Sequence, residues 1–138
     1  MTLIRLDEAA FVAGQIEPED MEAIAAAGIR TIVNNRPDRE QAGQPEARLI
    51  AEAARSAGLD YHFIPVASGV SNAQIAAMAE ILGRASTPVL AFCRSGTRST
   101  MLWALARAKL GDDPDEIEAK ARAAGFDLAP IAAFLHNR

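Results

Sequence analysis

The chain is poor in cysteine, histidine and aromatic residues. Its 138 residues include one cysteine, two histidines, one tryptophan and one tyrosine, and aromatic residues make up 5% of the total. A single cysteine excludes an internal disulfide and a multi-cysteine metal site, and the two histidines are far apart with no cluster of further ligands nearby. No stretch has the length and flanks of a transmembrane helix or signal peptide. We therefore expect no metal, no membrane association and a reducing, cytoplasmic setting.

The chain also lacks an excess of positive charge. Lysine and arginine number 14 against 18 aspartates and glutamates, which leaves a formal net charge of −4. This balance argues against a surface built for nucleic acid or anionic lipid, so any basic site must be local. Half of the residues are hydrophobic, and the length suits one domain with its own core. We expect a single domain over residues 1–138.

Short apolar runs alternate with helical patterns along the chain, which is typical of an α/β fold. The patterns predict strands over residues 10–13, 29–34, 59–66 and 88–92, and helices over residues 18–28, 45–58, 71–84 and 98–110. The last third of the chain is predicted to be all helical. We expect a mainly parallel sheet of four to five strands flanked by helices, in which ligands bind at the carboxyl ends of the strands.

The most informative stretch surrounds the single cysteine, Cys93. It lies between the apolar run 88–92 and the helical pattern that starts at Arg98, so it falls at a strand-to-helix turn. The backbone N–H groups of such a turn and the positive end of the helix dipole form an anion-binding site. The guanidinium of Arg98 can bind a tetrahedral oxyanion through two hydrogen bonds, and Arg94 adds positive charge beside the sulfur. A cysteine in these surroundings is a candidate nucleophile at neutral pH.

Several further motifs, taken together, carry a resemblance to a known family. They are Gly14-Gln15-Ile16 with Pro18, Asn34 to Asp38 with Glu40, Ile64-Pro65-Val66, Cys93 to Ser99, and Leu102-Trp103. Over nearly its whole length the chain resembles a bacterial family, the phosphatase-like domain of beta-lactamase-hydrolase-like proteins, whose members are also labelled sulfur transferases. The resemblance implies a fold like that of the dual-specificity phosphatases, with Cys93 as the nucleophile.

The candidate site residues follow from the turn and from this resemblance. Cys93 and Arg98 are the candidate catalytic residues, and the anion is expected to contact Arg94, Ser95, Gly96, Thr97, Ser99 and Arg36. Ser99 either donates a hydrogen bond to the thiolate, as the resemblance suggests, or caps the following helix. Arg36 follows the strand 29–34, so it either approaches the same crevice or remains a solvated turn residue.

Two departures from the phosphatase pattern bear on the chemistry. Phosphatases of this kind have a histidine before the cysteine and five residues between the cysteine and the arginine. This chain has Phe92 before Cys93. Four residues separate Cys93 from Arg98, and a loop of this length is the one found in rhodaneses. Such phosphatases also place an aspartic general acid in the loop that corresponds to residues 67–71, which contains no carboxylate here. Asp38 and Glu40 are candidate substitute acids, although each can instead pair with a nearby arginine.

The missing acid favours sulfur transfer over phosphate ester hydrolysis. A phenolate leaving group departs slowly unless it is protonated, and general acid catalysis is typically worth about 10²–10⁴ in rate. Sulfite, which leaves when a thiolate attacks thiosulfate, is a stable anion and needs no proton. We therefore expect a rhodanese-like sulfurtransferase that forms a persulfide on Cys93. A phosphatase of the protein tyrosine or dual-specificity type is the alternative, and a non-catalytic anion-sensing module is a third possibility.

These functions share the same expected ligands. Each takes a small sulfur-containing or phosphate-containing anion, and sulfur transfer adds a low-molecular-weight thiol as a candidate acceptor. None of them requires a cofactor, a nucleic acid or a membrane.

Overall fold

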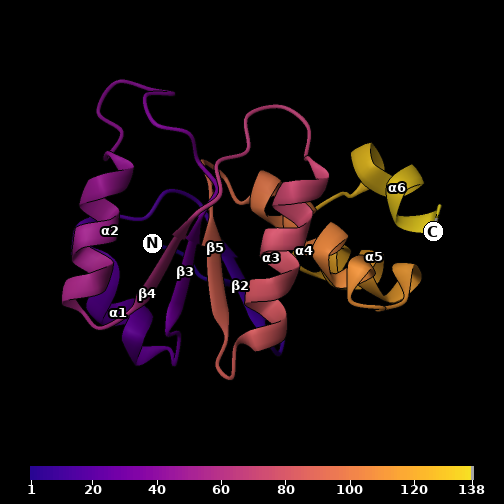
Figure 1. The fold of residues 1–138 in the computed structure, drawn as a ribbon, viewed down its shortest axis with the longest axis horizontal. Helices are drawn as coiled ribbons and strands as arrows, with labels where there is room; N and C mark the ends of the chain where they lie inside the picture. Colours follow the sequence, from indigo (N-terminus) through magenta and orange to yellow (C-terminus); the bar gives the residue numbers. More distant parts are fainter. Residues whose placement is uncertain (138) are drawn as a thin grey trace.

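A five-stranded sheet forms the centre of the computed structural model, which describes residues 1–137 (Figure 1). The strands follow the order β1-β2-β5-β3-β4, and their bounds are β1 (Ile4–Asp7), β2 (Ala10–Ala13), β3 (Thr31–Asn34), β4 (Asp60–Phe63) and β5 (Val89–Phe92). Strands β2, β5, β3 and β4 are parallel, whereas β1 pairs antiparallel with β2. The predicted α/β fold with a mainly parallel sheet is confirmed, and β1 is the strand that the sequence patterns missed.

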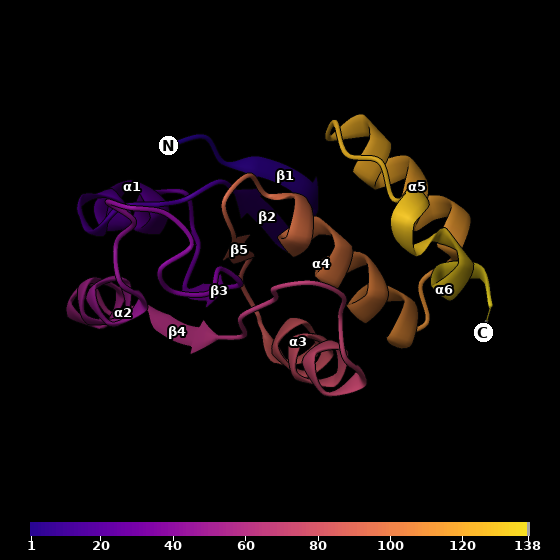
Figure 2. The same ribbon diagram turned by 90° about the horizontal axis from the view of Figure 1, so that it is seen from above.

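Helices cover both faces of the sheet (Figure 2). One face carries α1 (Met21–Ala26), which follows the short 3₁₀ turn Pro18–Asp20, and α2 (Ala47–Ser56). The other face carries α3 (Asn72–Arg84) and α4 (Thr97–Lys109), and beyond α4 lie α5 (Pro114–Ala123), the 3₁₀ turn Ala129–Ile131 and α6 (Ala132–His136). The helical last third of the chain is therefore confirmed. Among the described residues, no helix combines the length and the apolar character needed to cross a membrane.

Helix α4 is enclosed on nearly all sides, by the sheet, by α3 and by α5 and α6. Its buried residues include three alanines, whose small side chains let neighbouring helices approach closely. Trp103 is fully buried, and its indole Nε1 donates a hydrogen bond to Asp7 Oδ2 of β1 at 3.2 Å. This packing fixes the axis of α4 and hence the position of its first turn, where the chain arrives from β5.

The loop after β4 is anchored by the start of α3. Ser71 and Gln74 form a capping box, in which the Gln74 backbone N–H donates to Ser71 Oγ at 3.1 Å and the Ser71 backbone N–H donates to Gln74 Oε1 at 2.8 Å. Gln74 Nε2 also donates to the Pro65 carbonyl at 2.7 Å. One side chain thus ties the helix cap to the loop that follows the edge strand.

Candidate active site

Cys93 lies at the carboxyl end of the central strand of the sheet. Strand β5 is buried along its whole length between β2 and β3, and Cys93 is the first residue after it. The Cys93 N–H donates to the Ala13 carbonyl at 3.3 Å, and the Asn35 N–H donates to the Phe92 carbonyl at 2.8 Å. The loop is therefore held from both neighbouring strand ends. The loops that follow β3 and β4 rise at the same edge of the sheet (Figure 1).

Gly96 gives the Cys93 loop its shape. Its φ of 91° lies in the left-handed region, where glycine carries no Cβ penalty, and it is the N-cap of α4. The Gly96 N–H donates to Cys93 Sγ at 3.1 Å, so a backbone amide faces the sulfur. The Thr100 hydroxyl donates to the Gly96 carbonyl at 2.8 Å and holds this peptide in place. The first N–H groups of α4 have no intrahelical partners, because no preceding turn exists to accept their hydrogen bonds.

A second glycine lets the end of β2 approach the loop. A Cβ on Gly14 would lie 2.9 Å from the Arg94 carbonyl oxygen, which is shorter than real Cβ contacts allow. The neighbouring Gln15 N–H donates to that same carbonyl at 3.3 Å. Backbone contacts therefore brace the loop from the side opposite α4.

The remaining loop residues form its exposed rim. Arg94, Ser95 and Thr97 are exposed, whereas Cys93 is 1% exposed beneath them. The hydroxyls of Ser95 and Thr97 lie 3.1 Å apart. A ligand must therefore pass between these exposed side chains to reach the buried sulfur.

Arg98 is held by the Glu40 carboxylate and by the Val66 carbonyl, and no oxygen of the described residues is hydrogen-bonded to its Nε. Its Nη1 donates to Glu40 Oε2 and to the Val66 carbonyl, both at 2.7 Å, and its Nη2 donates to Glu40 Oε1 at 2.9 Å. These contacts use both hydrogens of Nη1 and one of Nη2. The Nε hydrogen and the second Nη2 hydrogen form the lateral fork of the guanidinium, which matches a tetrahedral oxyanion. The pKa of Arg98 is raised mainly by the hydrogen bond to Glu40, and the negative charge of a Cys93 thiolate adds to the effect.

Glu40 is held as a carboxylate. Its pKa is lowered from an ordinary 4.5 to about 2, chiefly by the hydrogen bond from Arg98, while burial opposes the shift and Arg36 adds to it. Arg36 Nε donates to Glu40 Oε1 at 2.9 Å, so one carboxylate lies between two guanidinium groups. A group that is ionised at neutral pH has no proton to give. The geometry favours a positioning role for Glu40 over the predicted role of substitute acid.

Asp38, the other candidate acid, contacts a helix start. Its Oδ1 accepts a hydrogen bond from the Ala47 N–H, the first residue of α2, at 2.7 Å. A carboxylate in this place satisfies one of the free N–H groups of the helix and favours the positive end of its dipole. Asp38 therefore organises the loop after β3.

Arg36 reaches the crevice, as one of its two sequence interpretations expected, and each of its three side-chain nitrogens donates one hydrogen bond to a protein oxygen. It is 3% exposed, and besides Glu40 it donates to Gln15 Oε1 and Gln41 Oε1, each at 3.0 Å. Its backbone N–H donates to Asn34 Oδ1 at 2.8 Å. Arg36 therefore supports the carboxylate that holds Arg98.

Ser99 makes neither of the two contacts that were predicted for it. Its hydroxyl donates to Asn35 Oδ1 at 2.8 Å, and Asn35 Nδ2 donates in turn to the Ile64 carbonyl at 2.9 Å. The N-cap of α4 is Gly96 instead. Ser99 is fully buried, so its hydroxyl joins α4 to the loops that follow β3 and β4.

Sequence reasoning missed the partners that complete this network. Gln15, Gln41 and the Val66 carbonyl all contact Arg36 or Arg98. One signal was present: Gln15 follows β2 and Val66 follows β4, so both lie at the same edge of the sheet as Cys93. Nothing in the local sequence indicates which arginine each group would contact.

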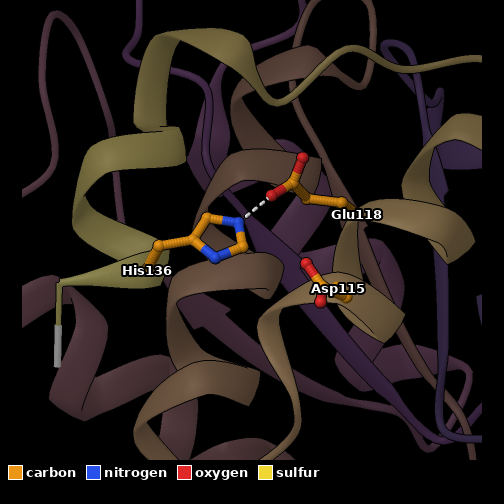
Figure 3. Close-up of side chains that lie close together, drawn as sticks. All are labelled: Asp115, Glu118 and His136. Atoms are coloured by element: carbon orange, nitrogen blue, oxygen red, sulfur yellow. Dashed lines mark hydrogen bonds and ion pairs between the residues drawn. The ribbon is translucent and has the colours of Figure 1, made fainter.

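A separate group of titratable side chains joins α5 to α6 (Figure 3). Asp115, Glu118 and His136 point toward one another, with one ligand atom of each lying within 4.8 Å of the others. His136 Nε2 is hydrogen-bonded to Glu118 Oε1, and this bond is the main cause of the raised pKa of His136. The sequence analysis found no cluster of ligands around either histidine. Here the fold brings two carboxylates to His136 from another helix, and the group serves as a surface ion pair between α5 and α6.

Two hollows lie near the sheet. A wide one of about 930 Å³ runs along the edge strand β4, and no residue of the Cys93 loop lines it. A smaller one of about 390 Å³ has Arg98 in its wall. Of the Cys93 loop, Arg98 is among the residues that line this hollow, whereas Cys93 is not.

Comparison with known proteins identifies relatives over the whole chain. Residues 3–110 match the family described as "Beta-lactamase hydrolase-like protein, phosphatase-like domain". A beta-lactamase hydrolase-like protein of Agrobacterium fabrum is 36% identical over 140 residues, which cover all of this chain and 32% of that protein. The chain thus spans about a third of the length of the curated relatives it matches.

Solved structures agree with this assignment. The crystal structure of a candidate phosphatase from Neisseria meningitidis is 38% identical, with a TM-score of 0.84 over 99% of this chain and 98% of that one. The structure of kinase associated phosphatase, in which the catalytic site cysteine is substituted by serine, has a TM-score of 0.75 over 99% of this chain and 91% of that one. At 17% identity the second likeness concerns the fold alone.

Proposed function

The chain belongs to the phosphatase-like domain family of beta-lactamase hydrolase-like proteins, and from this premise we propose that it is a cysteine-dependent phosphatase acting on phosphate monoesters. One observation carries the proposal. Cys93 lies at the carboxyl end of the central strand of a phosphatase fold, with the Gly96 N–H on its sulfur and with Arg98 held in place by Glu40. From the sequence we expected a sulfurtransferase, with a phosphatase as the alternative. The relatives favour the phosphatase.

In the proposed first step the Cys93 thiolate attacks the phosphorus of the ester. The S–P bond forms, the bond from phosphorus to the ester oxygen breaks, and that oxygen leaves with the electron pair. The Nε and Nη2 hydrogens of Arg98 and the N–H groups at the start of α4 donate to the phosphoryl oxygens, where negative charge gathers. The product of this step is a phosphocysteine.

In the proposed second step a water molecule hydrolyses the phosphocysteine. The new bond joins the water oxygen to phosphorus, the P–S bond breaks, and its electron pair returns to Cys93. The proton of the water passes to solvent, and inorganic phosphate leaves. Arg98 and the loop amides bind the phosphoryl group in both steps, so the same site serves each.

The leaving oxygen takes its proton from water in this account. The loop of residues 67–71 carries no carboxylate, and Glu40 is ionised. Because general acid help is absent, esters with weakly basic leaving groups are expected to react faster than alkyl esters. Turnover is accordingly expected to be slow.

Sulfur transfer is the second candidate function, and the four-residue spacing between Cys93 and Arg98 supports it. Here the thiolate attacks the outer sulfur of thiosulfate, the S–S bond breaks, and sulfite leaves with the electron pair. The persulfide on Cys93 then passes its outer sulfur to a low-molecular-weight thiol. A reducing, cytoplasmic compartment would keep Cys93 available for either reaction.

A paired assay tests the proposal. The wild type, Cys93→Ser and Arg98→Lys are incubated with para-nitrophenyl phosphate, and in parallel with thiosulfate followed by mass measurement. We expect phosphate release that Cys93→Ser abolishes. A cyanide-labile gain of one sulfur without ester turnover would establish sulfur transfer instead. Absence of both reactions, with stabilisation by phosphate that survives Cys93→Ala, would indicate an anion-sensing module.

A further inference from the structure

The groove beside Arg98 has almost entirely apolar walls. It is formed by the loop after β4, by the start of α3, by α4 and by residues 130–134. Its larger side chains are Val70, Ile75, Met101, Leu105, Ile131 and Phe134. Arg98 is the only charged residue among its described lining residues, and Asn72 carries the only other polar side chain. The groove therefore offers one positive charge beside an uncharged surface.

The apolar walls are left open to water. Phe134 is 70% exposed, and Met101 is partly exposed, whereas Leu105 and Ile131 are buried behind them. Large apolar side chains that stay exposed beside convergent polar groups are typical of ligand sites.

We propose that this groove binds the apolar alcohol part of the substrate, so that among phosphate monoesters with equally basic leaving groups those with a longer apolar chain are preferred. The inference rests on the proposed phosphatase function. Arg98 provides charge complementarity for the phosphoryl group. Asn72 is the only other described lining residue with a polar side chain, so a charged or strongly polar substituent would lose hydration on entry that the walls largely fail to replace. The volume of about 390 Å³ lies at the lower end of the range for small-molecule sites.

A chain-length series tests the inference. The rate of phosphate release from ethyl, butyl, hexyl and octyl phosphate is measured below micelle-forming concentrations. Each methylene that leaves water is expected to raise kcat/KM about two- to fourfold. Phe134→Ala and Met101→Gln are expected to flatten this dependence. Phe63→Ala is the matched control, because Phe63 is also exposed but lies on β4 outside the groove.

Binding measurements separate the inference from the proposed function. The affinities of alkylphosphonates of the same lengths for the wild type and for Phe134→Ala are measured by calorimetry. If neither these esters nor para-nitrophenyl phosphate is hydrolysed but affinity rises with chain length and falls in Phe134→Ala, the phosphatase proposal fails and the groove proposal stands. Cys93-dependent hydrolysis at equal kcat/KM from ethyl to octyl, with equal phosphonate affinities, would overturn the groove proposal alone.

Discussion

Glu40 and Arg98, 58 residues apart in the sequence, form a two-pronged ion pair with N–O distances of 2.7 and 2.9 Å. Arg36 binds the same carboxylate from the other side at 2.9 Å. The arginine that is proposed to bind the phosphoryl group is therefore oriented before any ligand arrives. Orientation in advance lowers the entropy that binding must remove, and it is the main contribution that a positioning residue makes.

Glu40→Gln is expected to lower kcat/KM about 10- to 100-fold, because the neutral amide orients Arg98 less firmly. The inhibition constant of inorganic phosphate is expected to rise, since the same guanidinium binds it. Steady-state kinetics and phosphate inhibition check both effects. Glu46→Gln, which alters an exposed ion pair with Arg48, is the control and should leave the kinetics unchanged. If both variants had the same kinetic constants, Glu40 would have no positioning role.

The Glu40 carboxyl also makes stability depend on pH. Its pKa is about 2 in the folded protein against an ordinary 4.5, so the folded state favours the ionised form. The resulting stabilisation is present in full above about pH 4.5 and is lost as the pH falls toward about 2. We expect the melting temperature of the wild type to fall more steeply over this range than that of Glu40→Gln. If the melting temperatures of the two proteins fell in parallel with pH, the lowered pKa of Glu40 would be contradicted.

Ser99→Ala is expected to destabilise the protein by about 1–3 kcal/mol, because it leaves the buried Oδ1 of Asn35 without its donor. Urea unfolding monitored by Trp103 fluorescence measures the loss. Ser95→Ala is the matched control, since this hydroxyl is exposed and should change stability by less than about 0.5 kcal/mol. If the two variants lost equal stability, the link between α4 and the loop after β3 would not matter.

Gly14→Ala is expected to displace the Cys93 loop, because the new methyl group would lie 2.9 Å from the Arg94 carbonyl oxygen. Activity should fall together with stability. Gly83→Ala offers a sharp contrast: it lies inside α3, where its Cβ would meet only a Leu110 side-chain carbon at 3.8 Å. That variant should gain about 0.5–1 kcal/mol from helix propensity at unchanged activity. If Gly14→Ala kept its activity and stability as Gly83→Ala does, the close approach at Gly14 would be tolerated.

Local sequence patterns predicted the helices and strands that are determined by residues close together in the sequence. The strands β2 to β5 and the helices α1 to α5 are marked by apolar runs and by apolar residues at helical spacing, and the Ser71 capping box spans only four consecutive residues. Strand β1, which was missed, is four residues long like the other strands, and only Leu6 on it is buried. It is defined by its antiparallel pairing with β2, which no local pattern reveals.

The same distinction between local and long-range contacts applies to the site. The turn around Cys93 could be predicted because strand, loop and helix are contiguous in the sequence. The partners of Arg98 and Ser99 could not, because they come from residues 32 to 64 positions away and depend on side-chain directions at a shared sheet edge. The role of Cys93 as nucleophile stays a prediction that rests on its place in the fold.

The most direct test is to trap the covalent intermediate. The protein is mixed with para-nitrophenyl phosphate, quenched in the time of one turnover and analysed by mass spectrometry of the peptide that contains Cys93. We predict a gain of one phosphoryl group on Cys93 that forms and decays at rates compatible with kcat, with none in Cys93→Ser. Ester turnover without any modification of Cys93, or turnover that persists in Cys93→Ser, would contradict the account.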